Sequence, residues 1–503
     1  MENMFSYCDE ITSLDLRTFN TLSVMNMNGM FKGLLLTSLD LSNFDTSNVI
    51  DMSQMFFDMT KLERLNISNF NTINVKYMNR MFSKSTKLKE IDLRNCDTSN
   101  VEDFYKMFSE CKSLINLDIS NFKTTSAKNM ASMFENCSLI TSLDFSNLEA
   151  RNVINMEQIF SGCENIKFIN LSNFQADNVD NLTLMFEDCK NLVSVDLSNF
   201  KALKIRYTGG MFKNCLNLKE LVFGKNFITK NVKNMAQMFY NCRSLISLDL
   251  SNFDTSNLLQ ISKLFYNCQS LTSIDLSTFN ISNIMGFDYM FYNCNSLTSL
   301  DLSSFYTNNS LTMTFLFFNC TSLTYLNITN FNTRDVSTMH HMFSNCVSLT
   351  SIDISNFNTT NLDDMSNMFS NCKNLNSIKF PNFNIKKFCY MDSMFLNCIS
   401  LTSIDPSYFG NPKVVNLDNM FYGCEKLTSI DLSNLDISEI ISMNSILYNC
   451  PSLQYIDVST FSTNGKVILS DFQAETGVLK IKKEFLEQLY IKPPDTWTII
   501  LDT

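Results

Sequence analysis

Apolar and polar residues recur along the chain with a fixed period of 26 residues. A representative unit, Leu245 to Ser270, reads LISLDLSNFDTSNLLQISKLFYNCQS. Its first residues alternate, with Leu248 and Leu250 on one side and Asp249 on the other, which predicts a short strand with one buried face. The next seven residues, SNFDTSN, are typical of turns. A fixed period in this range favours a solenoid of stacked coils over separate globular domains.

The second half of each unit has a different apolar spacing. Steps of 3, 3, 1 and 3 residues predict the single apolar stripe of a short helix, α or partly 3₁₀. One example is the set Val101, Phe104, Met107, Phe108 and Cys111. Asn residues followed by Asp three positions later predict helix N-caps, at Asn48 with Asp51, Asn100 with Asp103 and Asn361 with Asp364. If this half is extended instead, the solenoid is straighter.

The two halves together predict an α/β solenoid of about 18 repeats of 26 residues. Strands stacked at ~4.8 Å form one parallel sheet, and helices on the other side need ~8–10 Å each, so the sheet lines the concave side. We expect the solenoid to occupy residues 1–461. Residues 462–503 change character and read as a strand, a short helix from Lys483 to Leu489, a Pro-Pro turn and a final strand with Trp497. This segment is predicted to cap the open apolar end.

Cysteines mark the period most clearly. One column has 18 positions, of which 15 are Cys, and only Cys96 and Cys389 lie outside it. A line of single cysteines does not converge on one point, as ligands of a metal must. Cysteines on helices spaced ~8–10 Å apart are too distant for disulfides. We therefore predict buried free thiols that pack as small apolar groups, beside a Met-Phe column that is also core.

Charge and composition narrow the function classes. The chain has 503 residues, with 39 Lys and Arg against 50 Asp and Glu, a net charge of −11. This balance argues against a general nucleic-acid binder. No apolar run of ~18 residues predicts a membrane span, and no secretory leader is visible in Met1 to Glu10. The only two His, His340 and His341, are predicted to be an exposed pair. No motif predicts an enzyme, a cofactor or a metal site.

An aspartate column between the strand leucines is the first candidate binding feature. It includes Asp249, Asp275, Asp301 and Asp353, all on the exposed side of the predicted strands. At a spacing of ~4.8 Å, neighbouring carboxylates repel by roughly 0.9 kcal/mol in water. Either hydrogen bonds from flanking Ser hydroxyls and turn amides offset this repulsion, or the column binds a cation or a basic partner.

Departures from the repeat are the second candidate feature. Aromatic residues replace Ser beside the aspartate column at Phe168, Tyr325 and Tyr455, and lysines enter at Lys379, Lys386 and Lys387. These are candidate contact residues, because aromatics dominate interface hot spots. The repeat is also interrupted at residues 221–227, LVFGKNF, where equivalent residues of successive repeats lie 27 positions apart instead of 26. Neutral drift within a repeat array is the alternative explanation.

The full repeat resembles a known family. Residues 346–357, CVSLTSIDISNF, followed by NTTNLDDMSNMFSNC, are similar to BspA-type leucine-rich repeats, found in surface proteins of bacteria and some microbial eukaryotes. The resemblance implies a leucine-rich-repeat solenoid that contacts a protein or glycan partner, and a location at the cell surface or outside the cell. We expect a non-enzymatic binding protein. An intracellular interaction scaffold is the alternative, because no leader or anchor is visible.

Overall fold

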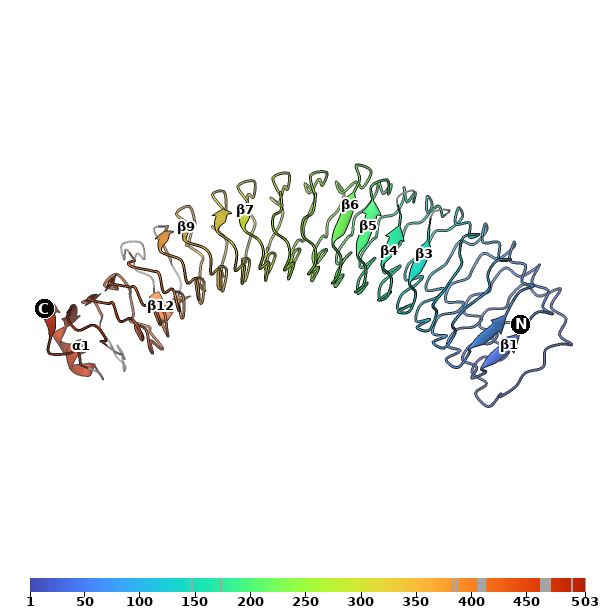
Figure 1. Cartoon of the computed structure of the whole chain (residues 1–503), viewed down its shortest axis with the longest axis horizontal. Coiled ribbons are helices and arrows are strands. Elements are labelled where there is room, and N and C mark those ends of the chain that lie inside the picture. Colours follow the sequence, from blue (N-terminus) through green and yellow to red (C-terminus); the bar gives the residue numbers. More distant parts are fainter. Residues whose placement is uncertain are drawn as a thin grey trace. The chain divides into compact units, whose positions relative to one another are not determined.

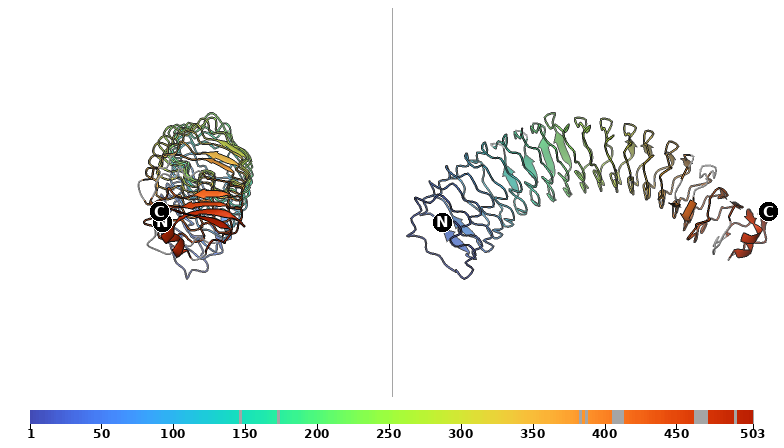
Figure 2. Two further views of the ribbon diagram at one scale, coloured as in Figure 1. Left: turned by 90° about the vertical axis from the view of Figure 1, so that its left-hand side faces the viewer. Right: turned by 180° about the vertical axis from the view of Figure 1, so that it is seen from behind.

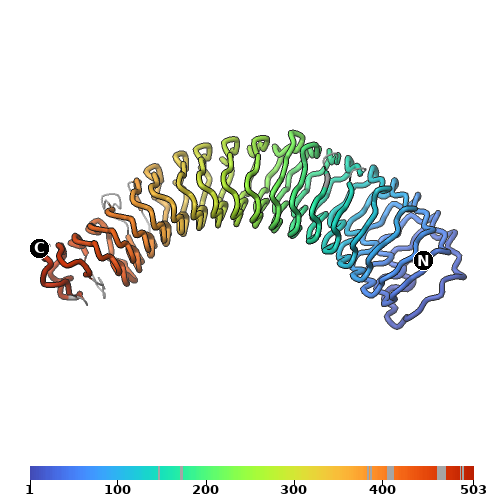
Figure 3. Tube along the Cα trace, viewed as in Figure 1, coloured from blue at the N-terminus to red at the C-terminus, as the bar shows by residue number. Residues whose placement is uncertain are grey.

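The computed structural model of the chain describes residues 1–145, 148–171, 174–381, 384–385, 388–404, 413–461, 472–489 and 492–502. The chain forms two compact units, Met1–Asn257 (unit 1) and Leu258–Thr503 (unit 2). Each unit is a stack of similar coils that lie side by side, one coil per repeat (Figures 1 and 3). The predicted solenoid architecture is therefore present in both units.

Short parallel strands stack along one side of each unit, as Figure 2 shows for the strands of the C-terminal sheet. Their alternation places every second side chain inside, as in the exposed, buried, exposed pattern of Ser38, Leu39 and Asp40. The predicted parallel pairing of neighbouring strands is confirmed, but the described strands form six sheets of two or four strands and not the one continuous sheet that was predicted. The strands are β1 (Ser38–Asp40), β2 (Arg64–Asn66), β3 (Ser142–Asp144), β4 (Phe168–Asn170), β5 (Ser194–Leu197), β6 (Glu220–Phe223), β7 (Ser299–Asp301), β8 (Tyr325–Asn327), β9 (Ser351–Asp353), β10 (Ser377–Lys379), β11 (Phe388–Tyr390), β12 (Lys413–Asn416), β13 (Ser429–Asp431), β14 (Tyr455–Val458), β15 (Gly477–Lys482) and β16 (Trp497–Asp502).

The predicted short helices are wrong. Within the described part of residues 1–461, the second half of each repeat contains turns and no α-helix. Residues such as Gln54 (φ 54°) and Asp58 (φ 62°) adopt left-handed conformations, which interrupt a right-handed helix. The backbone instead bonds to the next coil, as when Phe56 N–H donates to the Met81 carbonyl at 2.9 Å.

A second parallel ladder replaces the helices. Single-residue parallel bridges connect Asn26, Asp51, Tyr77, Asp103, Asn129, Asn155, Asn181, Tyr207 and Asn234 in unit 1, and Gly286, Thr312, Thr338, Asp364 and Tyr390 in unit 2. The layer of wide helices that placed the sheet on the concave side is thus absent from the described repeats. The argument that the sheet lines the concave side therefore no longer applies.

The predicted helix caps have other roles. Asn48 Nδ2 donates to the Leu22 carbonyl of the preceding coil at 2.7 Å, and Asp51 Oδ1 accepts from Ser53 N–H at 2.8 Å. The other two predicted pairs repeat this pattern, since the amides of Asn100 and Asn361 also donate to carbonyls of the preceding coil. These Asn residues therefore join coils and do not begin helices.

The core consists of stacked columns of identical side chains. The Met-Phe column is buried, as predicted, and its rings stack between successive coils. Phe134 lies 5.6 Å from Phe108 and 6.0 Å from Phe160, centroid to centroid. In unit 2, Phe369 lies 5.3 Å from Phe343. Each coil thus buries its apolar residues against the same residues of its neighbours.

The C-terminal segment contains the predicted elements. Strands β13 to β16 form one four-stranded parallel sheet, and α1 (Lys483–Gln488) follows β15. Trp497 is buried, and its Nε1–H donates to the Ala474 carbonyl at 3.1 Å. Phe485 of α1 packs against Phe461 of the last repeat, 6.0 Å between ring centroids. The capping role, with a boundary at residue 461, stays a prediction that this packing favours.

Candidate partner-binding surface

The outward side chains of the strands, together with the side chain two positions after each strand aspartate, form what we call the strand face. Its aspartates share one local geometry, in which carboxylate Oδ1 accepts the backbone N–H two residues later. The distances are 2.8 to 3.1 Å at Asp40, Asp118, Asp196, Asp249, Asp275, Asp301 and Asp353. Asn66 and Asn327 make the same bond where Asn fills the column.

These turn bonds stabilise the ionised carboxylates. The backbone amide and hydroxyl of Ser251 lower the pKa of Asp249 below its usual value. At Asp353 the hydroxyl of Ser355 is the largest cause of a lowered pKa, followed by the backbone amide. The hydrogen bonds that the first explanation of the column requires are therefore present, while a role of the column in binding a partner stays a prediction. Among the described residues, no group of three or more His, Cys, Asp or Glu could hold a metal ion.

Lysine and arginine occupy the second carboxylate oxygen at several positions. Lys379, opposite Asp353 in the β9–β10 register, places Nζ 3.1 Å from Asp353 Oδ2. The predicted contact residues Asp353 and Lys379 are thus brought together. Similar pairs that the sequence prediction missed are Arg17 with Asp15, Arg94 with Asp92 and Lys480 with Asp457. The sequence could have revealed the Asp15 and Asp92 pairs, because Arg stands two residues after each of these Asp residues, where most repeats have Ser.

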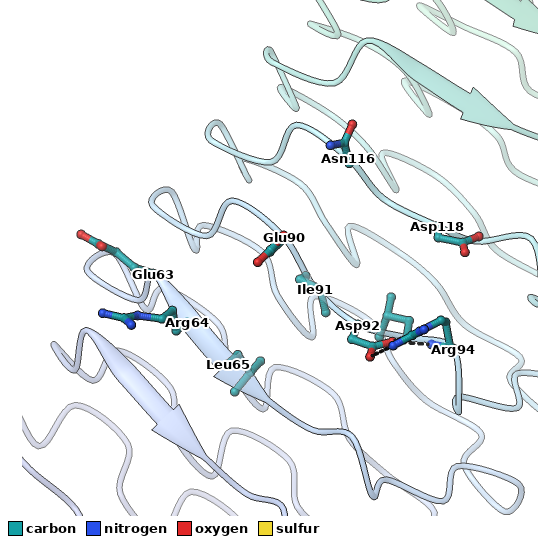
Figure 4. A pocket seen from close by; sticks show the side chains of 10 residues that line it. Glu63, Arg64, Leu65, Glu90, Ile91, Asp92, Arg94, Asn116 and Asp118 are labelled. Carbon is teal, nitrogen blue, oxygen red and sulfur yellow. Dashed lines mark hydrogen bonds and ion pairs between the residues drawn. The ribbon is translucent and has the colours of Figure 1, made fainter.

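A shallow hollow lies on the strand face of unit 1. It has a volume of about 520 Å³ and is lined by charged side chains from three coils, including Arg64, Glu90, Arg94 and Asp118 (Figure 4). The ion pair of Asp92 with Arg94, 2.8 Å between Oδ2 and the guanidinium nitrogen, lies among its lining residues. An open hollow of mixed charge can hold polar groups of a partner.

Two of the predicted aromatic contacts are strongly exposed. Phe168 on β4 is 60% exposed and Tyr325 on β8 is 53% exposed, while Ser fills this column in most other repeats. Val222 on β6 replaces an aspartate and is 51% exposed. Asp301 lies on β7, which pairs with β8, the strand that contains Tyr325. The predicted contacts Lys386 and Lys387 lie outside the described residues.

The break near residue 224 has a structural cause. A Cβ atom added to Gly224 would lie 1.6 Å from the carbonyl oxygen of Ser198 in the preceding coil. Only glycine permits this approach of two backbones. Gly224 therefore permits the close approach of these two coils.

The cysteine column lies inside the coils. None of the 17 Cys, all of which the structure describes, forms a disulfide, and all but Cys8 are buried. Thiols donate to a Phe carbonyl of the preceding coil, as Cys137 does to Phe108 at 3.1 Å, and burial raises the pKa of Cys111 to about 12. The helix spacing used to exclude disulfides was wrong, because coils stack at ~4.8 Å. Parallel, equivalent side chains nevertheless keep the sulfurs at that spacing, far beyond an S–S bond of ~2.05 Å.

The prediction of an exposed histidine pair is wrong. Both rings are partly buried on the turn side of unit 2. His341 stacks on Phe315, with ring centroids 4.6 Å apart, and burial followed by the charge of His340 lowers its pKa to about 4. His340 Nδ1 lies 2.5 Å from Ser366 Oγ. Ser366 lies between His340 and Asp364, so the order differs from that of a hydrolase triad.

One family model matches most of the chain. A family model described as Mycoplasma protein of unknown function, DUF285, matches residues 1–114, 36–143, 86–169, 139–224, 216–325, 287–408 and 379–474. No curated protein matches the chain. Within the described residues, no helix has the length and hydrophobicity needed to cross a membrane.

Several solved structures are similar. A leucine-rich repeat protein from Bacteroides ovatus is 18% identical, with 81% of this chain and 89% of that chain covered and a TM-score of 0.39. A leucine rich cell surface protein from Faecalibacterium prausnitzii is 20% identical, with 59% and 87% covered and a TM-score of 0.26. The pneumococcal vaccine antigen PcpA is 13% identical, with 83% and 85% covered and a TM-score of 0.33. These neighbours are bacterial leucine-rich repeat proteins, which is consistent with the resemblance to BspA-type repeats.

Proposed function

We propose that this chain, which belongs to the family described as Mycoplasma protein of unknown function, DUF285, is a non-enzymatic binding protein. Its strand face recognises a protein or glycan partner, and the chain acts at the cell surface or outside the cell. A repeat solenoid suits this role, because it offers one long, regular surface on which a few substituted positions select the partner.

One observation carries the proposal: large apolar side chains are exposed where the repeat has small polar ones. Phe168 and Tyr325 each replace Ser on a face of Ser, Thr and Asp. Large exposed aromatics contribute nothing to the core, and burial of such side chains against a partner supplies much of the energy of an interface. Val222, exposed two strands along the β4-β5-β6 sheet from Phe168, extends this contact area in unit 1.

The test replaces the exposed residues by the residue of the repeat. Phe168→Ser and Tyr325→Ser restore the Ser of the column and leave the core untouched. Partners are captured from source-cell lysates, medium and host matrix extracts with the full chain, and binding of each captured partner is then measured for every variant. We expect both substitutions to weaken binding by tenfold or more. A control is Met285→Ser, which removes a side chain of similar exposure (66%) next to Gly286 of the second ladder. Equal losses in all three variants, or no loss at Phe168 and Tyr325, would contradict a role of the strand face.

Location has its own test. Intact source cells are treated with protease, lysed cells serve as the control, and peptides of this chain are quantified. Loss from intact cells supports action at the surface. Survival in intact cells, with digestion after lysis, would overturn the surface proposal and favour the intracellular scaffold.

A further inference from the structure

Unit 2 contains an acidic stretch of strand face whose four coils supply no basic residue, although Lys379 of the following coil pairs with Asp353. Four successive coils read TSIDLS, TSLDLS, TYLNIT and TSIDIS at 272–277, 298–303, 324–329 and 350–355. Their outward residues are hydroxyls, Asp275, Asp301 and Asp353, with Asn327 and the exposed ring of Tyr325 between them. A surface of this composition is complementary to positive charge.

Unit 2 itself shows how this column holds an ammonium group. In Asp353 the turn amide occupies Oδ1, and Lys379 of the next coil places Nζ 3.1 Å from Oδ2. Asp457 and Lys480 repeat the arrangement at 3.1 Å, with the Ser459 amide on Oδ1. In both pairs the turn amide occupies Oδ1 and the lysine ammonium occupies Oδ2, whereas Oδ2 of Asp301 accepts from Asn327 Nδ2 at 3.3 Å.

Tyr325 adds an aromatic partner for a cation. Its coil lies between those of Asp301 and Asp353, and Ser299 of β7 is its direct neighbour in the register. The ring is 53% exposed. An exposed tyrosine with carboxylates on both sides attracts Lys and Arg side chains through cation–π contact and charge together.

We propose that this face of unit 2, centred on Tyr325, Asp301 and Asp353, binds an extended lysine- and arginine-rich segment of a partner protein. The inference rests on the proposed function and names the partner class for this part of the strand face. Asp301 and Asp353 are two coils apart, about 9.6 Å at ~4.8 Å per coil. Three residues of polyproline II span about 9.3 Å, so basic residues at every third position match the two carboxylates.

The experiment uses two synthetic probes on the full chain. One is a peptide of four Lys-Pro-Pro units, and the other has Glu in place of each Lys. We expect binding of the lysine peptide only, and at least tenfold weaker binding when NaCl is raised from 50 to 500 mM. Asp301→Asn removes the charge but keeps a turn acceptor, as Asn327 does in the next coil, and we expect about fivefold weaker binding.

A second substitution should act in the opposite direction. Lys379→Asn removes the internal ammonium from Asp353, and binding of the lysine peptide should tighten about threefold. Tyr325→Ser should weaken it about threefold. Equal binding of both peptides, or changes of the same sign in Asp301→Asn and Lys379→Asn, would overturn the inference. If a captured partner depends on Phe168 and Tyr325 but not on these charges or on salt, the partner class is wrong while the proposed function stands.

Discussion

Alkaline pH should unfold unit 1 because its cysteine column cannot ionise while folded. Cys137, Cys163 and Cys189 lie inside successive coils and donate to Phe carbonyls at 3.1 to 3.2 Å. Burial raises the pKa of Cys163 to about 12 and also raises the pKa values of Cys137 and Cys189 well above that of an exposed thiol. In the unfolded chain, thiols ionise near pH 8.5. The folded state therefore binds more protons between these values, so stability is full below about pH 8.5 and falls as pH rises toward 12.

The size of the stability loss follows from the ionisation of the thiols in the unfolded chain. At pH 10 each thiolate that forms only on unfolding costs the folded state about 2 kcal/mol, so three thiols account for about 6 kcal/mol. Replacing Cys137, Cys163 and Cys189 by Ser removes this pH dependence. Serine already occurs in this column, where Ser85 Oγ donates to the Phe56 carbonyl at 2.9 Å. The variant should fold normally at pH 7.5.

The assay is guanidinium unfolding of the wild-type chain and the triple Ser variant at pH 7.5 and pH 10 under reducing conditions. Tyr and Lys titrate equally in both proteins, so the difference between their pH effects isolates the three thiols. We expect the wild type to lose about 6 kcal/mol more than the variant. Losses that agree within about 1 kcal/mol would refute the reasoning. Before unfolding, a thiol reagent should modify only Cys8 rapidly, since the other cysteines are buried.

Three further substitutions test the interactions that hold the coils together. Asp249→Ala removes the carboxylate that accepts the Ser251 amide and should lower Tm by roughly 2–4 °C, whereas Asp249→Asn keeps the acceptor and should change Tm by less than about 1 °C in a thermal scan. Gly224→Ala places a Cβ against a backbone carbonyl and should prevent normal folding as judged by circular dichroism, while Gly209→Ala, whose nearest atoms lie at 3.4 Å, should be tolerated; equal effects would contradict the close approach. Phe134→Ala opens a gap in the ring stack and should cost about 3–5 kcal/mol in denaturant unfolding, and a loss under 1 kcal/mol would show that the stack is not a continuous core.

The aspartate column illustrates how far local sequence reasoning reaches toward the site. Alternation placed Asp301 outside and Leu300 inside, because successive side chains of a strand point to opposite faces, and the structure agrees. The hydrogen-bond explanation also followed from local residues, since the donor at Asp301 lies only two positions away. The ion pair of Asp353 with Lys379 could not be inferred in the same way, because its partners are 26 residues apart and depend on strand register.

The helix prediction failed for a physical reason that the sequence does not reveal. Apolar steps of three or four residues suit one face of a helix, but they also suit a coil that turns every three residues around a core. The choice depends on where the backbone N–H groups find acceptors: Phe56 N–H reaches Met81 of the next coil, and an isolated repeat has no such acceptor. Stacking also lets residues such as Asp58 adopt left-handed conformations that cost energy locally.

The sequence by itself determined the repeat, the strand positions, the buried Leu, Met-Phe and Cys columns, and the aspartates on the outside, because each follows from side-chain type and short-range periodicity. Only the tertiary structure decided that the second half of each coil is a β ladder, which cations pair with which aspartates, and that Phe168 and Tyr325 remain exposed. These features arise between coils, where contacts join residues one period apart. The period tells which residues are neighbours in adjacent coils, but it does not tell how their backbones hydrogen-bond.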